Sequence, residues 1–335
     1  MTFRVLICDD SSFARKQMAR ALPTGLAGGL SFATDGREAL AMVRQDPPDL
    51  LLLDLTMPVL DGYQVLAALR EEGIPTPVLV VSGDIQPEAQ ERVLELGAIG
   101  FIEKPTGARN LLPYLEALGI EAGSEPDTPP LDAELDIPVD AMDAYRELIN
   151  VAMGRAGDLL ARVLGNFVQL SIPNVNLFEG GELHMTLTHV TARDNVYAVC
   201  QGFVGRDLAG EAILIFNDAS LADLAELLQR QGEVDKYAKT ELLMDMANLL
   251  IGACLKGISE QLERPFSEGR PVILGQNARL DEMLAGRHSL WRPTLAVEIG
   301  YHVENHHIDC NLLLLFTQDS LPTLDSQLAA LETGR

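Results

Sequence analysis

The chain has 335 residues, a formal net charge of -24, and hydrophobic side chains at 47% of its positions. This length predicts two domains that each bury a core, and the composition is that of a globular protein. So negative a charge argues against nucleic-acid backbones and anionic membranes as partners. The chain opens on a strand pattern and has no apolar run of membrane-spanning length, so we expect no signal peptide and no membrane insertion. The cysteines lack CxxC or zinc-ligand spacing, which indicates reduced thiols in a cytoplasmic protein: Cys8, Cys200, Cys254 and Cys310.

Residues 1–119 alternate short apolar runs with helical patterns. Continuous apolar runs at 5–8, 50–53 and 78–81 are typical of buried parallel strands, and 31–33 and 100–102 are weaker strand candidates. Helical patterns fall between and after them, at 12–21, 36–45, 63–72, 87–96 and 109–118. This alternation predicts an α/β doubly wound fold with a five-stranded parallel sheet.

The pattern changes after residue 119. Residues 120–138 are acidic and rich in proline, which predicts a solvated linker. Residues 139–335 predict an α+β domain with long helices at about 140–167 and 238–262 and an amphipathic helix at 221–231. Strand-like runs lie at 183–190, 196–204, 211–216, 272–274, 294–303 and 309–316.

One side-chain spacing occurs twice in this second domain, 98 residues apart. The first copy is Asp143, Glu147, Asn150 and Pro173, and the second copy is Glu241, Asp245, Asn248 and Pro271. On a helix of 3.6 residues per turn, the two acids and the asparagine of each copy share one stripe. With further matches at offsets of 98 and 100, the spacing predicts an internal duplication with pseudo-twofold symmetry, in repeats of about 139–235 and 236–335.

Side chains suited to phosphoryl transfer stand at the ends of four predicted strands of the first domain. Asp9 and Asp10 follow the first strand, Asp54 the third, Ser82 the fourth and Lys104 the fifth. The carboxyl ends of parallel strands meet at one edge of a sheet, so we expect these side chains to converge. One carboxylate can attack phosphorus while others hold a divalent cation, and a hydroxyl and an ammonium can neutralise phosphoryl oxygens.

With Met57-Pro58 and Asp61-Gly62, this constellation resembles the response-regulator receiver family, of which CheY is the single-domain example. The resemblance covers about residues 1–119. It implies that Asp54 is phosphorylated by a sensor histidine kinase and that Mg²⁺ is bound by Asp10, Asp54, the Thr56 carbonyl and, through water, Asp9. It also implies that Ser82 and Lys104 contact the phosphoryl group, that Phe101 is the rotamer switch, and that Lys104-Pro105 is a cis peptide.

The repeated stripe resembles the CheC/CheX/FliY phosphatase family over about residues 139–325. That family has Asp or Ser, Glu four residues later, Asn three later and Pro 23 later. The first copy fits at every position, and the resemblance implies that Glu147 makes a docking contact and that Asn150 orients the attacking water. The second copy has Glu241 in place of Asp or Ser and Asp245 in place of Glu. Because Asp245 is one methylene shorter than Glu, we expect a less active or inactive second site at Asp245 and Asn248.

His302, Glu304 and His306 alternate along a predicted strand and, with His307 and Asp309, raise the question of a metal site. A polar strand face or turn is the better interpretation, because no ligand from a third element is identifiable.

The sequence thus favours a response regulator of two-component, chemotaxis-type signalling whose output domain is an aspartyl-phosphate phosphatase controlled by phosphorylation at Asp54. Its substrate is either another phosphorylated CheY-like receiver or the chain's own receiver. The alternative is a non-catalytic adaptor, gated by phosphorylation, that binds a phosphorylated receiver or another signalling partner. A homodimer is compatible with either hypothesis.

Overall fold

The computed structural model describes residues 3–23, 29–119, 140–177, 196–228, 236–278 and 293–333. The chain forms two compact units, Met1–Glu147 and Leu148–Arg335, and the boundary between them falls inside helix α6 (Ala141–Leu164). The predicted linker at 120–138 and the predicted strand at 183–190 lie outside the described residues.

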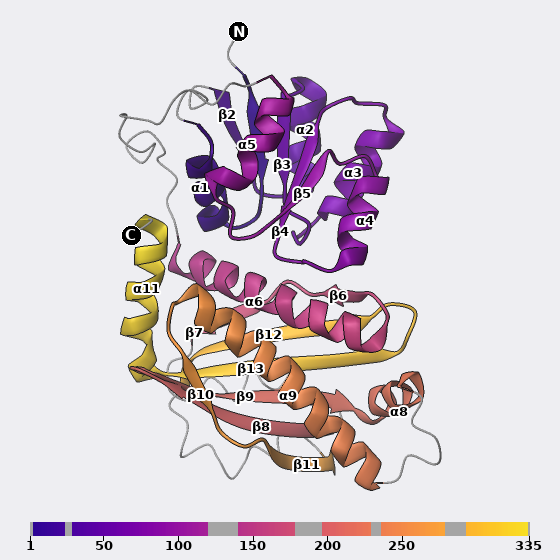
Figure 1. The fold of residues 1–335 in the computed structure, drawn as a ribbon, viewed down its shortest axis with the longest axis vertical. Helices are drawn as coiled ribbons and strands as arrows, with labels where there is room; N and C mark the ends of the chain where they lie inside the picture. Colours follow the sequence, from indigo (N-terminus) through magenta and orange to yellow (C-terminus); the bar gives the residue numbers. More distant parts are fainter. Residues whose placement is uncertain are drawn as a thin grey trace. The chain divides into compact units, whose positions relative to one another are not determined.

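The first unit contains the predicted five-stranded parallel sheet, in the order β2-β1-β3-β4-β5 (Figure 1). Its strands are β1 (Val5–Cys8), β2 (Leu30–Ala33), β3 (Leu50–Leu53), β4 (Val78–Ser82) and β5 (Gly100–Glu103). All five strands match their predicted ranges to within one residue, and β1 and β3 match at both ends. The prediction succeeds because strands covered on both faces need continuous apolar runs, and β1, β3 and β4 are buried throughout.

Helices cover both faces of this sheet. They are α1 (Ser12–Ala21), α2 (Gly36–Gln45), α3 (Gly62–Glu71), α4 (Pro87–Glu95) and α5 (Ala108–Ala117). Leu50 and Leu52 pack with α1 and α5, whereas Leu51 and Leu53 pack with α2, α3 and α4. Alternate side chains of one strand therefore supply two separate cores, as the period of two of a β-strand requires. Asp35 and Asp61 cap α2 and α3 by accepting backbone N–H bonds.

The second unit is built on an eight-stranded antiparallel sheet, so it is an α+β fold. The main strand path is β10-β8-β9-β13-β12-β6, while β11 pairs with β8 and β7 pairs with β12. The strands are β6 (Val168–Leu170), β7 (Asn174–Leu177), β8 (Val196–Gly205), β9 (Leu208–Asn217), β10 (Phe266–Glu268), β11 (Val272–Ala278), β12 (Pro293–Val303) and β13 (Ile308–Thr317). The two longest hairpins, β8–β9 and β12–β13, meet at the β9–β13 pair in the middle of the sheet.

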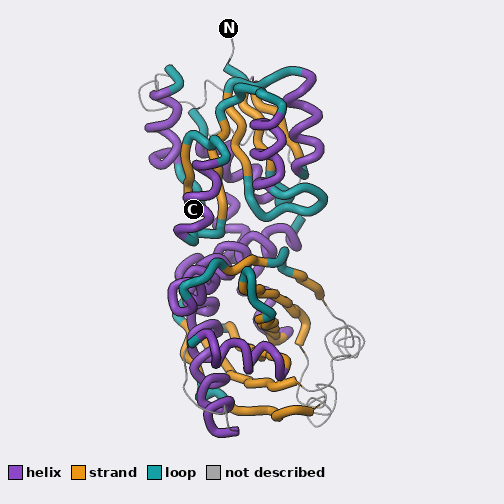
Figure 2. The backbone as a smooth tube through the Cα atoms, turned by 90° about the vertical axis from the view of Figure 1, so that its right-hand side faces the viewer, coloured by secondary structure: helices purple, strands orange, loops and turns teal. Residues whose placement is uncertain are grey.

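Two long helices, α6 and α9 (Lys236–Gln261), cross each other closely. A Cβ placed on Gly257 of α9 would lie 2.8 Å from the Cα of Ala152 on α6, so only glycine permits this approach. Gln261 adds a bond from its amide nitrogen to the Leu148 carbonyl oxygen. Helix α9 packs against β8, β9 and β10 and runs obliquely across the strands in Figure 1, and Figure 2 shows helices beside the strands of this unit.

By length and composition, Tyr237–Gln261 is the one stretch of the described chain that could cross a membrane, but 61% of its most apolar window is buried inside the fold. Burial of this kind is what a core helix of an α+β fold shows, so the stretch is weak evidence for a membrane span.

Two serines, 100 residues apart, join the two hairpins reciprocally. Ser220 begins the buried part of α8 (Asp218–Leu227); its Oγ accepts from Asp309 N at 2.9 Å and donates to His307 O at 3.1 Å. Ser320 lies in the turn η3 (Gln318–Ser320); its Oγ accepts from Ala209 N at 2.9 Å and donates to Ala209 O at 3.1 Å. Ser220, which follows the hairpin β8–β9, thus binds the backbone at the start of β13. Ser320, which follows the hairpin β12–β13, binds the backbone at the start of β9.

Several elements of the second unit were not predicted from the sequence. These are the short strands β6, β7 and β10 and the last helix, α11 (Leu321–Thr333). The strands have three or four residues each, too few for an alternating pattern to stand out, and pairing with β8 or β12 specifies them. The helix predicted at 221–231 ends at Leu227, and α6 ends at Leu164 rather than 167 because Gly165 adopts φ +64°.

Candidate functional site

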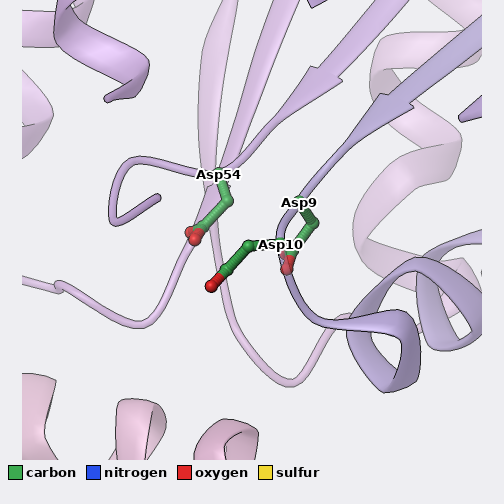
Figure 3. Close-up of side chains that lie close together, drawn as sticks. All are labelled: Asp9, Asp10 and Asp54. Carbon is green, nitrogen blue, oxygen red and sulfur yellow. The ribbon is translucent and has the colours of Figure 1, made fainter. Parts of the chain in front are cut away.

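Three aspartates meet at the carboxyl edge of the parallel sheet. Asp9 and Asp10 follow β1, and Asp54 follows β3, the neighbouring strand. One carboxylate oxygen from each lies within 4.8 Å of the others (Figure 3). Asp9 and Asp54 are buried, and Asp10 is half-buried. The predicted convergence of the strand-end acids is therefore what the structure shows.

Lys104 provides the positive charge of this cluster. Its Nζ lies 2.7 Å from Asp9 Oδ2 and 3.4 Å from Asp54 Oδ1, and its side chain is only 3% exposed. Burial alone lowers the pKa of Lys104, but the carboxylates of Asp54 and Asp9 outweigh burial and raise that pKa well above its ordinary value. Lys104 is therefore a permanent cation at the site, and its peptide bond to Pro105 is cis.

The carboxyl groups carry more negative charge than Lys104 neutralises. Burial and repulsion from Asp9 raise the pKa of Asp10 to about 7. Burial also raises the pKa of Asp54 well above its ordinary value, although Lys104 opposes that shift. A divalent cation at this cluster would relieve the same repulsion.

The donor set fits a hard cation such as Mg²⁺. All three side chains offer carboxylate oxygens, the ligands that Mg²⁺ prefers. Asp54 Oδ2 is buried and has no hydrogen-bond partner among the described residues, which is costly for an oxygen with no further ligand. These residues therefore fit the metal that the sequence predicts.

The remaining predicted residues of the first unit come from β4, β5 and the loop after β3. Ser82 is buried at the end of β4, and its Oγ accepts from Asp84 N. Thr56 lies two residues beyond Asp54 and is half-buried, as is Phe101 on β5. A Cβ on Gly62 would lie 2.3 Å from the Asp54 carbonyl oxygen, so glycine lets α3 begin directly beside Asp54.

The first stripe starts on α6, inside the unit Met1–Glu147. Asp143 accepts a bond from Ser12 Oγ at 2.7 Å, and a carboxylate oxygen of Glu147 lies 3.4 Å from Lys104 Nζ. Asn150 follows in the unit Leu148–Arg335; it is buried, and its Oδ1 has no hydrogen-bond partner in the described part of the chain. Pro173 is buried just before β7.

The second stripe has a different environment. Glu241, Asp245 and Asn248 lie on α9 with exposed side chains, and Pro271 is half-buried before β11. The two copies therefore share their spacing but not their burial.

His302 and Asp309 face each other across the β12–β13 pair, with Nδ1 and Oδ1 2.8 Å apart. Within the described residues, this pair is not part of a group of three or more metal-ligating side chains.

Arg15 is a residue of the acid cluster's turn that sequence reasoning missed. Its Nη1 donates to the carbonyl oxygens of Asp9 and Asp10 at 2.6 and 3.1 Å. A basic residue five or six positions after a pair of acids is too common a pattern to identify such a role from sequence.

Curated relatives of two kinds each match about a third of the chain. A protein-glutamate methylesterase/protein-glutamine glutaminase of Symbiobacterium thermophilum is 41% identical over 111 residues, 32% of this chain and 30% of that protein. Response regulator MprA of Mycolicibacterium vanbaalenii is 37% identical over 120 residues, 35% of this chain and 51% of that protein. This chain thus covers about a third to a half of the length of these relatives.

Two solved structures align with about half of this chain. FliY of Thermotoga maritima aligns with a TM-score of 0.44 and 16% identity over 56% of this chain and 95% of that chain. A CheC-like superfamily protein of a Shewanella species aligns with a TM-score of 0.38 and 13% identity, over 50% of this chain and 96% of that one. Both scores are below 0.5, so neither similarity establishes the fold of the second unit.

The model of the response regulator receiver domain family matches residues 5–116. The matched range contains the parallel sheet and the aspartate cluster together with Lys104. Residues 5–116 are therefore a response regulator receiver domain.

Proposed function

We propose that this protein is a two-domain response regulator whose second unit, a CheC-like fold made by internal duplication, hydrolyses the aspartyl phosphate of a receiver. In this proposal a sensor histidine kinase phosphorylates Asp54, and the protein works in the cytoplasm in chemotaxis-type signalling. The second unit acts on a phosphorylated receiver, either this chain's own or that of a separate CheY-like protein.

The geometry of the acid cluster supports the proposal that Asp54 is phosphorylated. The Asp54 carboxylate attacks the phosphorus of the donor, a P–O bond forms, and the bond to the donor's histidine nitrogen breaks. Ser82 and Lys104 contact the phosphoryl oxygens, and Lys104 offsets their charge from a buried position. Asp10, Asp54 and the Thr56 carbonyl would hold Mg²⁺, and Asp9 would contribute through water; the bound metal would supply further charge neutralisation.

The phosphatase proposal depends on the contrast between Glu147 and Asn150. The Glu147 carboxylate lies 3.4 Å from Lys104, the lysine that also contacts Asp54, so an acid of this stripe can recognise the phosphoacceptor site. Asn150, three residues later, keeps a buried Oδ1 that no described residue satisfies. An unsatisfied buried carboxamide oxygen is suited to accept a hydrogen bond from water.

The reaction needs little covalent chemistry from the protein. Water attacks phosphorus in line, the bond between phosphorus and the Asp54 oxygen breaks, and the carboxylate leaves as inorganic phosphate forms. Asn150 orients the water, and Glu147 positions the helix against Lys104. The second stripe is less suited to this chemistry, because Asp245 is shorter than Glu and its three polar side chains are exposed.

The exposed second stripe favours a second candidate function. A polar stripe on a solvated helix face can bind a phosphorylated receiver or another signalling partner without turning it over. In this adaptor hypothesis phosphorylation at Asp54 controls binding, and a homodimer would present two such surfaces. Catalytic loss of phosphate separates the two hypotheses.

The decisive experiment measures phosphate release from a phosphorylated CheY-like receiver at limiting enzyme. Asn150→Ala is expected to lower turnover by about 100-fold, because water is left unoriented. Asn248→Ala, the matched change in the second stripe, is expected to lower turnover less than about threefold. An Asp54→Asn background removes the chain's own receiver as a competing substrate.

The same variants decide between substrates. Loss of phosphate from the chain's own Asp54 at a rate that is independent of protein concentration and is lowered by Asn150→Ala indicates that the receiver is its own substrate. If Asn248→Ala is the more damaging change, the ranking of the stripes is wrong. If neither asparagine affects turnover, the stripe is not the catalyst; if there is no turnover at all, the adaptor hypothesis replaces the enzyme.

A further inference from the structure

The turn between β1 and α1 leaves two backbone carbonyls without a partner in regular secondary structure. The ladder of β1 ends where Asp9 N donates to Ala33 O and Asp54 N donates to Cys8 O. The first helical bond of α1 runs from Arg15 N to Ser11 O. The carbonyls of Asp9 and Asp10 lie between these two systems, at the residues that carry two of the three clustered carboxylates.

One side chain binds both carbonyls. Arg15, in the first turn of α1, donates from Nη1 to Asp9 O at 2.6 Å and to Asp10 O at 3.1 Å. Bonds from a guanidinium are charge-assisted and therefore stronger than bonds between neutral groups. The turn is braced further by Ser11 N, which donates to Asp9 Oδ1 at 2.9 Å.

We propose that Arg15 is a positioning residue for the receiver's cation site: by binding the two carbonyls, it holds the Asp9 and Asp10 carboxylates beside Asp54 in the arrangement that a divalent cation requires. The proposal rests on the cation site of the proposed function but not on the phosphatase. Arg15 acts through the backbone of the two acids and does not itself contact the cation.

Like-charge repulsion is the physical reason that the turn must be held in place by hydrogen bonds. Three carboxylates whose oxygens lie within 4.8 Å of one another repel, and a turn free to rotate would separate them. Mg²⁺ demands near-ideal octahedral geometry, so a shift of its ligands weakens binding. Lys104 restrains Asp9 and Asp54, but Asp10 receives no such bond, so its position depends on the backbone of the turn.

The sign of the effect of removing Arg15 distinguishes positioning from simple electrostatics. A guanidinium near a cation site repels the cation, so an electrostatic role predicts tighter binding when the charge is removed. Positioning predicts weaker binding when the bonds are removed. The two roles therefore make opposite predictions for one substitution.

The test is Mn²⁺ binding to the full chain, followed by loss of the free-ion electron paramagnetic resonance signal. Arg15→Met is expected to raise the Mn²⁺ dissociation constant about tenfold. Arg15→Lys, which keeps the positive charge but not the planar guanidinium, is expected to raise it about threefold. Lys16→Met removes the same charge from the next position of α1 and is expected to change the constant less than twofold. The Mn²⁺ binding that Asp54→Asn removes is the binding that belongs to this site.

A second readout needs no metal. In metal-free protein, hydrogen exchange in a peptide covering residues 8–16 is expected to be faster in Arg15→Met than in wild type, with unchanged exchange across β4. Global loss of protection in Arg15→Met would show misfolding, and Arg15→Lys then carries the comparison.

Each outcome of the Mn²⁺ experiment either supports or overturns the positioning role of Arg15. Weaker Mn²⁺ binding in both Arg15 variants, with Lys16→Met unchanged, supports the positioning role. Tighter or unchanged binding overturns it, and so does equal weakening by Lys16→Met. If wild type shows no Mn²⁺ site that Asp54→Asn removes, the cation site and the inference fall together, while the phosphatase proposal is still judged by phosphate release.

Discussion

At the scale of single residues, the receiver concentrates buried charge at the point where it is expected to accept a phosphoryl group. Asp9, Asp10 and Asp54 oppose one lysine, and burial with repulsion raises the pKa of Asp10 to about 7. Active sites commonly hold such strained charge, which a bound ion or substrate relieves. The strain has a measurable consequence for stability in metal-free protein.

We predict that Asp10→Asn stabilises the metal-free receiver in a pH-dependent way. The folded pKa of about 7 exceeds the unfolded value of about 3.9, so the folded state binds more protons between these values. The free energy of unfolding of wild type therefore falls as pH rises from about 4 to about 7. Asp10→Asn should raise it by roughly 2 kcal/mol at pH 8 in EDTA, with little gain at pH 4.

Urea unfolding measures this effect, with the receiver's transition identified by its shift on adding Mg²⁺. Glu71→Gln, an exposed acid at the end of α3, is the control and should change stability by less than about 0.5 kcal/mol at either pH. If Asp10→Asn raises the free energy of unfolding equally at pH 4 and pH 8, the raised pKa of Asp10 is contradicted.

At the scale of elements, the second unit is stabilised by hydrogen bonds between its two long hairpins. Ser220 and Ser320 are 0% and 1% exposed, and each uses one hydroxyl both to donate and to accept. The backbone atoms that they satisfy, at Asp309 and Ala209, are themselves 100 residues apart. This correspondence supports the proposed duplication, because the same contact is made from each half to the other.

We predict that Ser220→Ala and Ser320→Ala each lower the free energy of unfolding of the second unit by about 1–3 kcal/mol. Each change leaves a buried N–H and a carbonyl without the hydroxyl that satisfied them. Ser267→Ala on the exposed face of β10 is the control, with an expected loss below about 0.5 kcal/mol. Native-state hydrogen exchange in β9 and β13 reports the opening free energy of this unit alone. A lower free energy of unfolding in only one of the two serine variants would show that the two contacts are not equivalent.

At the scale of the whole molecule, Lys104 lies close to both Asp54, the proposed phosphoacceptor, and Glu147 on α6. Its Nζ is 3.4 Å from both Asp54 and Glu147, within the unit Met1–Glu147. A phosphoryl group on Asp54 would add oxygens that compete with Glu147 for this ammonium. The stripe would then sense the phosphorylation state of the receiver.

We predict that phosphorylation by a small phosphodonor with Mg²⁺ speeds hydrogen exchange at the start of α6, in a peptide covering residues 141–150. The reason is the weakened Lys104–Glu147 contact. The corresponding segment of α9, residues 241–250, serves as an internal control and should not change. Asp54→Asn should abolish the effect. Unchanged exchange in α6 at saturating phosphorylation would mean that the receiver does not signal through this stripe.

The sequence by itself determined the receiver almost completely. Continuous apolar runs such as 50–53 are typical of strands buried on both faces, and polar residues at the ends of parallel strands converge because those strands share one carboxyl edge. The long helices of the second unit were equally predictable, because α6 and α9 carry sustained helical patterns.

Only the tertiary structure decided the rest, because the deciding contacts join residues far apart in the chain or depend on burial. The strands β6, β7 and β10 are too short to carry a pattern and are specified by the strands that they pair with. The two stripes have the same spacing, yet Asn150 is buried and Asn248 is exposed. Arg15 acquires its proposed role from backbone carbonyls, which have the same chemistry at every residue and so leave no trace in the sequence.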